Sequence, residues 1–313
     1  MTFFTDEVTA EKPIGKPYGL ALRHAKLYVC DTALNAIRVL DLEKRTMTVF
    51  APEGEGRLHK PVNVAVDADG TRYVADTGRN QVLIYTSGGE FVGAIGPKPT
   101  NAPLEMVVPP TSPITTDDLA GWRPTDVLVA GNWLYVADLK NHLVRVYDKA
   151  TRQPLFTVPK DTNAEPAKLL VPTNLALDAQ GRLYVSDIGG CRVQQYDAEG
   201  NFLRSFGGIG DRPGEFARPK GVAVDQQGRL YVVDAAAQVV QIFDDQGRLL
   251  LYFGEPQSSA AALDLPAKVV IDYEHVPFFQ KFAAPGFQLE YLVLVSNQYG
   301  QHKVSVFGFG QKR

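Results

Sequence analysis

The chain has 313 residues, of which 45% are hydrophobic, so it can bury the core of one large all-β domain or of two ordinary domains. Its formal net charge of −3 excludes a global basic field that would draw it onto nucleic acid or anionic lipid. No apolar run reaches the roughly 18 residues needed to span a bilayer, and two cysteines are too few for a disulfide framework.

A repeat organises the chain. The segment from Pro172 to Asp187 returns 47 residues later as Pro219 to Asp234, with the same Asp-x-x-Gly-Arg-Leu-Tyr-Val core. A period in the forties with several short alternating segments per copy is typical of a β-propeller. We therefore predict an all-β fold, a single domain over residues 1–313 with six blades. They start near Pro17, Pro61, Pro124, Pro172, Pro219 and Pro266.

Each blade is predicted to hold four antiparallel strands. In the fourth copy, apolar residues alternate with small or polar ones over 174–178 and 183–186, and Asp-x-x-Gly supplies the tight turn between these strands. A third strand follows at 193–196 and a fourth at 202–206. The last copy ends after its third strand, so we expect residues 2–5 to supply the fourth and close the ring.

Two insertions interrupt the repeat. If inner strands start on the top face, the proline-rich segment 97–121 lies on top and the aromatic segment 273–288 lies at the bottom. The first is either a lid packed on the ring or a docking arm. The second either plugs the channel floor or binds a partner through its phenylalanines.

The motifs resemble those of the NHL-repeat family of six-bladed propellers. The shared features are the Pro-x-[Gly/Asn]-[Val/Leu]-Ala opening and the Tyr-Val-x-Asp strand end, and residues 141–143 spell Asn-His-Leu. The resemblance implies the fold, but not a function, because such propellers include lyases, lactonases, sensors, RNA-binding proteins and scaffolds.

The last blade also resembles those of bacterial cell-envelope NHL-repeat proteins, through Lys-Val-Val-Ile-Asp-Tyr at 268–273 and Val-Leu-Val-Ser-Asn-Gln-Tyr-Gly at 293–300. That resemblance implies a place in the periplasm or cell envelope and an accessory role beside multihaem cytochromes in electron transfer. The chain as given shows no signal peptide or lipobox, so we expect either that such a segment has been trimmed from it or that it is a cytoplasmic relative.

Polar residues recur at the top loops. An aspartate ends the second strand in five blades, and a shared position suggests a structural task, the capping of backbone N–H groups in the following loop. Four residues later most blades have a polar residue, which we also expect to be a loop cap, although His142 alone would suggest catalysis or metal binding. The predicted caps are Asp31, Asp76, Asp138, Asp187, Asp234, Asn35, Asn80, His142 and His302.

The blades differ at the second residue after the opening proline, where side chains should reach the mouth of the central channel. The six residues are Gly19, Asn63, Asp126, Asn174, Gly221 and Lys268. Asn63, Asp126, Asn174 and Lys268 are the candidate ligand-binding residues. The first three could hold calcium, since the resemblance to lactonase-type propellers implies a calcium at this depth held by Asn, Asp and Glu. Lys268, however, would repel a cation or pair with Asp126. A polar channel mouth or a small anion near Lys268 is the alternative, and no other cofactor is expected.

We therefore expect a monomeric, non-catalytic binding or scaffold propeller that binds a protein or ligand through its top face. The alternative is a calcium-dependent lactonase-like or esterase-like enzyme, or a lyase-like one, with its site at the channel mouth. A nucleic-acid partner is not expected, because the top-face arginines are spread over several blades and mixed with acidic residues.

Overall fold

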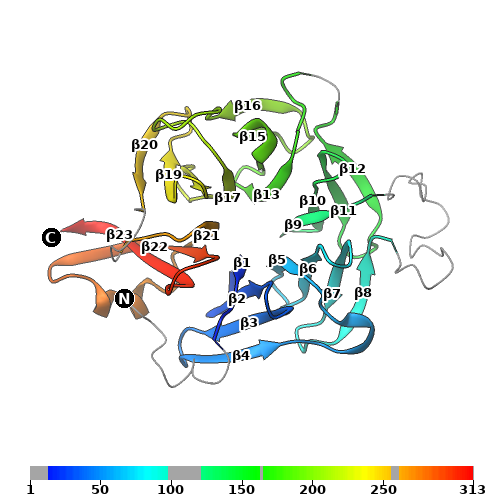
Figure 1. The fold of residues 1–313 in the computed structure, drawn as a ribbon, viewed down its shortest axis with the longest axis horizontal. Coiled ribbons are helices and arrows are strands. Elements are labelled where there is room, and N and C mark those ends of the chain that lie inside the picture. The colour runs from blue at the N-terminus through cyan, green and yellow to red at the C-terminus, as the bar shows by residue number, and fades with distance from the viewer. Residues whose placement is uncertain (1–12, 98–120, 163–164, 255–260, 313) are drawn as a thin grey trace.

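The computed structural model describes residues 13–97, 121–162, 165–254 and 261–312. Six antiparallel sheets stand around a central axis in chain order, as Figure 1 shows. Five have four strands, and the sixth has three within the described residues. The predicted six-bladed β-propeller is confirmed.

The strands of each blade run from the channel outward. Blade 1 comprises β1 (Pro17–Arg23), β2 (Lys26–Asp31), β3 (Ala36–Asp41) and β4 (Thr46–Phe50). After the 3₁₀ turn η1 (Gly54–Gly56), blade 2 comprises β5 (Pro61–Val66), β6 (Arg72–Asp76), β7 (Gln81–Tyr85) and β8 (Phe91–Ile95). Blade 3 comprises β9 (Pro124–Ala130), β10 (Trp133–Asp138), β11 (Leu143–Asp148) and β12 (Pro154–Val158).

The second half repeats this order. Blade 4 comprises β13 (Pro172–Leu177), β14 (Leu183–Asp187), β15 (Arg192–Tyr196) and β16 (Phe202–Phe206), with η3 (Ile188–Gly190) between β14 and β15. Blade 5 comprises β17 (Pro219–Val224), β18 (Leu230–Asp234), β19 (Val239–Phe243) and β20 (Leu249–Phe253). Blade 6 comprises β21 (Pro266–Asp272), α1 (Val276–Phe279), η4 (Gln280–Phe282), β22 (Phe287–Asn297) and β23 (Val304–Lys312).

The core is divided into six hydrophobic clusters, each shared by two neighbouring blades. Alternate residues of one strand point to opposite faces of its sheet, so a blade can bury both faces. In β2, for example, Val29 packs towards blade 6 and Cys30 towards blade 2, and both are fully buried. Because the cluster between blades 6 and 1 is as continuous as the others, the ring is closed by side-chain packing.

The bottom insertion packs differently from either expectation. It folds into α1 and η4, and Phe279 is 4% exposed in the cluster shared with Leu27 and Leu40 of blade 1. Phe278 and Phe287 pack partly buried against the same cluster, and the half-buried Phe282 contacts the rings of Phe278 and Phe279. The insertion is therefore a wedge between blades 6 and 1, neither a channel plug nor an open aromatic patch.

Two predicted features lie outside the described residues. One is the closing strand at 2–5, and the other is the top insertion at 97–121 except for its two end residues. Within the described residues, no helix has the length and apolar character needed to cross a membrane.

Candidate functional site

The channel mouth is shaped by an irregularity repeated in every blade. The pairing of each inner strand with its second strand shifts register just after the opening proline, as between Pro61 and Asn63 or between Pro172 and Asn174. Such a shift bends the strand and re-aims the side chains beside it. The mouth residues therefore leave the regular sheet and meet residues of neighbouring blades.

An ion pair crosses the channel. Lys268 Nζ of β21 lies 2.5 Å from Asp126 Oδ2 of β9, and these strands belong to opposite blades of the ring. The two side chains are only 11% and 2% exposed. The same Asp126 carboxylate accepts the backbone N–H groups of Val127 and Leu175, at 2.9 and 2.8 Å, and the Asn174 amide at 3.4 Å. Protein donors thus surround both of its oxygens.

Asn63 lies apart from this cluster. Its Nδ2 donates to the Thr125 carbonyl at 2.7 Å, whereas its Oδ1 is buried and has no hydrogen-bond partner among the described residues. A Cβ on Gly19 would lie 2.3 Å from that oxygen, so the glycine is what allows β1 and β5 to approach. Gly221 of β17 allows that strand to approach β21 in the same way, because a Cβ on Gly221 would lie 2.6 Å from Lys268 Cα. The structure thus brings together three of the four candidate residues.

A second polar contact at the mouth was not anticipated from the sequence. Lys220 Nζ of β17 donates to the Tyr18 hydroxyl of β1 at 3.0 Å and lies 4.6 Å from the centre of its ring. Lys220 is 2% exposed, and burial, followed by the charges of Arg218 and Lys16, lowers its pKa to about 8. Burial raises the pKa of Tyr18, which keeps its hydroxyl protonated. The sequence signal was present: these are the only large polar side chains immediately after an opening proline.

The strand-end aspartates bind backbone on both sides. Asp76 accepts the N–H groups of Gly78 and Arg79 in the following loop, and those of His59 and Lys60 in the preceding crossing between blades. Asp138, Asp187 and Asp234 likewise accept N–H groups from the preceding crossing, and Asp31 accepts those of Gly15 and Lys16, which precede β1. Each carboxylate therefore ties a crossing to its own blade.

The loop residues four positions later share a backbone conformation. Their φ angles are positive, a region that most residues other than glycine and asparagine avoid. The residues are Asn35 (51°), Asn80 (52°), His142 (59°), Cys191 (48°) and Gln238 (60°). In blade 6 the left-handed residue is Gly300 (71°), two positions before His302, so His302 is not the equivalent of the other five.

His142 is exposed, and its ring Nδ1 donates to the Leu170 carbonyl. We expect His142→Asn to lower the free energy of unfolding by less than about 1 kcal/mol, because asparagine tolerates this backbone and the lost hydrogen bond is exposed. We expect His142→Val to cost about 1–2 kcal/mol, because a β-branched residue is strained at this φ. Chemical denaturation of both variants tests this, and equal losses would contradict it.

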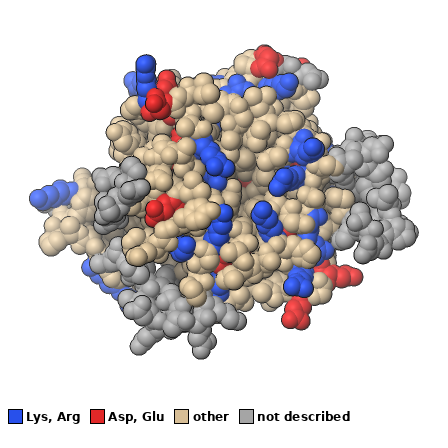
Figure 2. All heavy atoms as spheres, viewed as in Figure 1, with Lys and Arg blue, Asp and Glu red and all other residues tan. Residues whose placement is uncertain are grey.

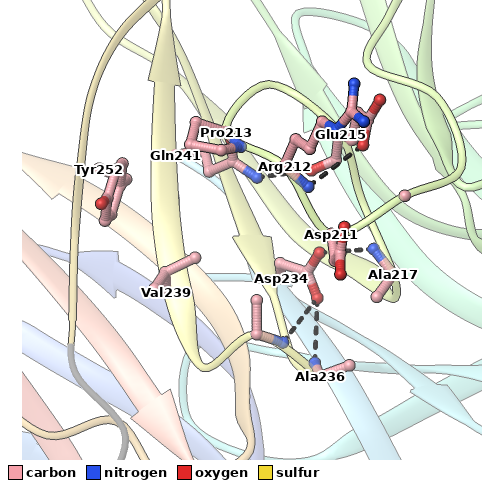
Figure 3. A pocket seen from close by; sticks show the side chains of 12 residues that line it. Asp211, Arg212, Pro213, Glu215, Ala217, Asp234, Ala236, Val239, Gln241 and Tyr252 are labelled. Carbon is pink, nitrogen blue, oxygen red and sulfur yellow. Dashed lines mark hydrogen bonds between the residues drawn. The ribbon is translucent and has the colours of Figure 1, made fainter.

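A pocket of about 400 Å³ opens on the top of blade 5. It lies between the crossing loop that contains Asp211 to Ala217 and the top of β18 and β19, with Tyr252 on its far side (Figure 3). Asp234 forms part of its wall while it holds the N–H groups of Ala217 and Ala236. The pocket therefore depends on the same aspartate that anchors the crossing.

The described parts of the chain show no candidate metal centre. Among the described residues there is no group of three or more His, Cys, Asp or Glu placed to hold an ion. His275 at the bottom pairs with Asp272 at 2.8 Å, and both are buried. The described cysteines, Cys30 and Cys191, are both free thiols.

Comparison with known proteins supports the fold. The NHL repeat matches residues 216–243. The structure of a virginiamycin B lyase from Staphylococcus aureus superposes with a TM-score of 0.59 at 13% identity, over 96% of this chain and 86% of that one. Regucalcin, a calcium-binding protein from Agrobacterium tumefaciens, superposes with a TM-score of 0.60 at 15% identity, over 99% and 94%.

A Bacteroides thetaiotaomicron protein of unknown function superposes with a TM-score of 0.62 at 17% identity, over 94% of this chain and 70% of that one. No curated protein matches the chain by sequence. At these identities the likeness concerns the fold, since propellers of one architecture have many functions.

Proposed function

We propose that this six-bladed propeller, which carries the NHL repeat, is a binding protein that docks a protein partner on the top of blade 5. The observation that carries the proposal is the pocket beside the crossing loop, because it adjoins apolar side chains in an ordered frame. Concave sites with apolar walls and a few polar groups are the usual places for recognition.

The crossing loop is held firmly. Ile209 pairs with Phe216 in an isolated bridge, and Phe216 is fully buried. Phe216 N–H donates to the Gly208 carbonyl at 2.7 Å, and Gly210 N–H donates to the Phe216 carbonyl at 3.1 Å. A preorganised loop loses little entropy on binding, which favours affinity.

Apolar groups border the pocket on both sides. Ile209 is 83% exposed immediately before the pocket-lining Gly210, and Tyr252 is 55% exposed on the opposite wall. An exposed isoleucine on an ordered loop beside an aromatic side chain has the character of an interface anchor. The polar rim is mixed in charge, with Asp211, Arg212 and Glu215.

The test is affinity capture with the protein as bait, compared between variants. We expect Ile209→Asp to abolish retention of the specific partner, because it places a charge where the partner buries an apolar group. Val92→Asp is the matched control, since Val92 is 44% exposed on the outer strand of blade 2, and it should retain the partner. Equal retention by both variants would refute docking at this pocket.

The alternative is a calcium-dependent enzyme at the channel mouth, of lactonase, esterase or lyase type. The buried Asn63 Oδ1 favours it, because this oxygen has no hydrogen-bond partner in the described part of the chain and carboxylate and amide oxygens are calcium ligands. The ammonium of Lys268 opposes it, since it already occupies the cation position beside Asp126. Calcium-dependent turnover of lactones or esters, lost in EDTA and in Asn63→Leu, would replace the binding proposal.

A further inference from the structure

Three positive charges gather at the mouth where blades 5 and 1 meet above blade 6. They belong to Lys16, Arg218 and Lys220. Among the described residues no carboxylate forms an ion pair with the charged nitrogens of these three side chains, in contrast to Lys268, although Asp31 and Asp234 accept the backbone N–H groups of Lys16 and Arg218. Figure 2 shows Lys and Arg side chains around the centre of the ring, with Asp and Glu mostly nearer the rim. Like charges held together without acidic partners repel one another, and a bound anion removes that cost.

Two tyrosine hydroxyls in this sector accept hydrogen bonds from lysines. Lys220 Nζ donates to Tyr18 and Lys16 Nζ donates to Tyr299, each at 3.0 Å. Each hydroxyl can also donate one hydrogen bond, and neither has an acceptor among the described residues. A hydroxyl that accepts from an ammonium is polarised and becomes a stronger donor. Two polarised donors beside three cations are a suitable environment for an oxyanion.

Blade 6 leaves room for this arrangement. At the position of Tyr18 and Lys220, its inner strand has only Ala267, which is fully buried. The side chains of Tyr18 in blade 1 and Lys220 in blade 5 can therefore meet above Ala267. Ser296 of blade 6 donates its hydroxyl to the Tyr18 carbonyl at 2.6 Å and fixes the backbone that carries the tyrosine. The site is thus built on strands of three consecutive blades.

We propose that Tyr18, Tyr299, Lys16 and Arg218, with Lys220 beneath them, bind a tetrahedral dianion, the phosphate group of inorganic phosphate or of a phosphate monoester. Phosphate offers several acceptor oxygens and about two negative charges at neutral pH, which matches two hydroxyl donors and a cluster of cations. Arg218 is exposed and Lys16 is half-buried, so both can reach the anion directly, whereas the buried Lys220 acts through the Tyr18 hydroxyl. This proposal is independent of partner docking at blade 5.

Binding should depend on pH through Lys220. Its pKa is about 8, and the groups that face it are the neutral Tyr18 hydroxyl and the cations Arg218 and Lys16. As pH rises through this value in the free protein, Lys220 loses its proton and one positive charge leaves the site. Affinity for phenyl phosphate, which stays dianionic in this range, should therefore fall between pH 7.5 and 9.5, two values that lie on either side of the pKa. Lys220→Arg keeps its charge and should remove this fall.

The experiment is calorimetric titration of the full chain at pH 7.5 with inorganic phosphate, phenyl phosphate and benzoate. We expect both phosphates to bind and benzoate not to bind. Tighter binding of phenyl phosphate would identify a monoester as the ligand, and equal binding would identify inorganic phosphate. Equal affinity for benzoate would overturn the proposal, because it would show only a general attraction of anions.

Variants assign the site. We expect Tyr18→Phe and Lys220→Met each to weaken phosphate binding about tenfold, the usual loss when a hydrogen bond to a charged group is removed. Lys60→Met is the matched control, since Lys60 precedes the opening proline of blade 2 as Lys16 does in blade 1, and it should change affinity less than about twofold. Tyr18→Phe keeps the aromatic ring beside Lys220 and removes only the hydroxyl. Its change in affinity therefore measures the contribution of the hydroxyl to binding, even if Lys220→Met perturbs folding. Unchanged affinity in Tyr18→Phe would refute the assignment.

Discussion

Replacing Lys268 with methionine should lower the free energy of unfolding by about 3–5 kcal/mol, because it leaves Asp126 as a buried charge without its cation. The pair spans the channel between opposite blades, and Asp126 is 2% exposed. The backbone N–H groups of Val127 and Leu175 would still solvate the carboxylate, so the protein should fold. Urea denaturation with tryptophan fluorescence measures the loss.

Two further variants distinguish the effect of leaving Asp126 unpaired from the effect of removing both charges or a surface lysine. Lys268→Met combined with Asp126→Asn removes both charges, and it should recover most of the lost stability, since an uncharged pair has no desolvation cost. Lys44→Met is the surface control, because Lys44 is 78% exposed in its contact with Asp41 and should change stability by less than about 1 kcal/mol. A double variant no more stable than Lys268→Met would mean that the loss does not come from the uncompensated buried charge of Asp126.

The two halves of the channel mouth therefore differ in how their charges are neutralised. On the side of Asp126 the cation position is filled by a lysine of the protein itself. On the side of Tyr18 the ammonium groups of Lys220 and Lys16 have hydroxyl partners, and among the described residues neither forms an ion pair with a carboxylate. An incoming cation competes with Lys268, whereas an incoming anion meets charges that are not yet neutralised.

The repeat made the fold predictable. Five blades share an aspartate at the end of the second strand and a tight turn before that strand. The strands and their order in one copy of the repeat therefore predict those of the other copies, and the number of copies predicts the number of blades. A repeated residue also indicates a repeated task. The aspartates bind crossing loops as well as following loops, however, and this second contact joins residues some 15 positions apart, such as Asp76 and Lys60, that no short-range pattern connects.

The site was predictable only in part. The ring of residues after the opening prolines follows from the blade frame, and it includes Asp126, Asn174 and Lys268, which do meet. Whether Lys268 reaches across the channel depends on channel width and side-chain length, which sequence does not specify. The contact of Lys220 with Tyr18 joins blades separated by a third blade, and it exists because Ala267 between them is small.

The bottom insertion shows another limit. Phenylalanines at 278, 279 and 282 indicate that these side chains are buried. The pattern does not indicate whether they pack against the channel floor, a partner or a neighbouring blade, because all three surfaces can be apolar. The direction in which the chain leaves β21 decides among them, and it leads towards blade 1. Such a direction is set by tertiary packing and is not encoded in the local pattern.

Replacing Asp234 with alanine should lower the free energy of unfolding by about 3 kcal/mol and weaken partner docking as well. The carboxylate accepts the N–H groups of Ala217 and Arg218 in the crossing, at 2.8 and 3.1 Å, and those of Ala236 and Ala237 in its own loop, at 3.0 and 3.1 Å. Asp234 is 1% exposed, so these donors are left poorly solvated when it is removed. Thermal and chemical denaturation, with capture of the partner, measure the two effects.

The matched control is Asp244→Ala in the same blade. Asp244 also accepts two backbone N–H groups, those of Gln246 and Arg248, but its turn is open to water, which can replace the carboxylate. We therefore expect a much smaller loss and unchanged docking. A loss in Asp234→Ala no greater than this would mean that the crossing is held by its buried Phe216 alone. In that case the pocket walls would not depend on the strand-end aspartate, and the five shared carboxylates would need another explanation.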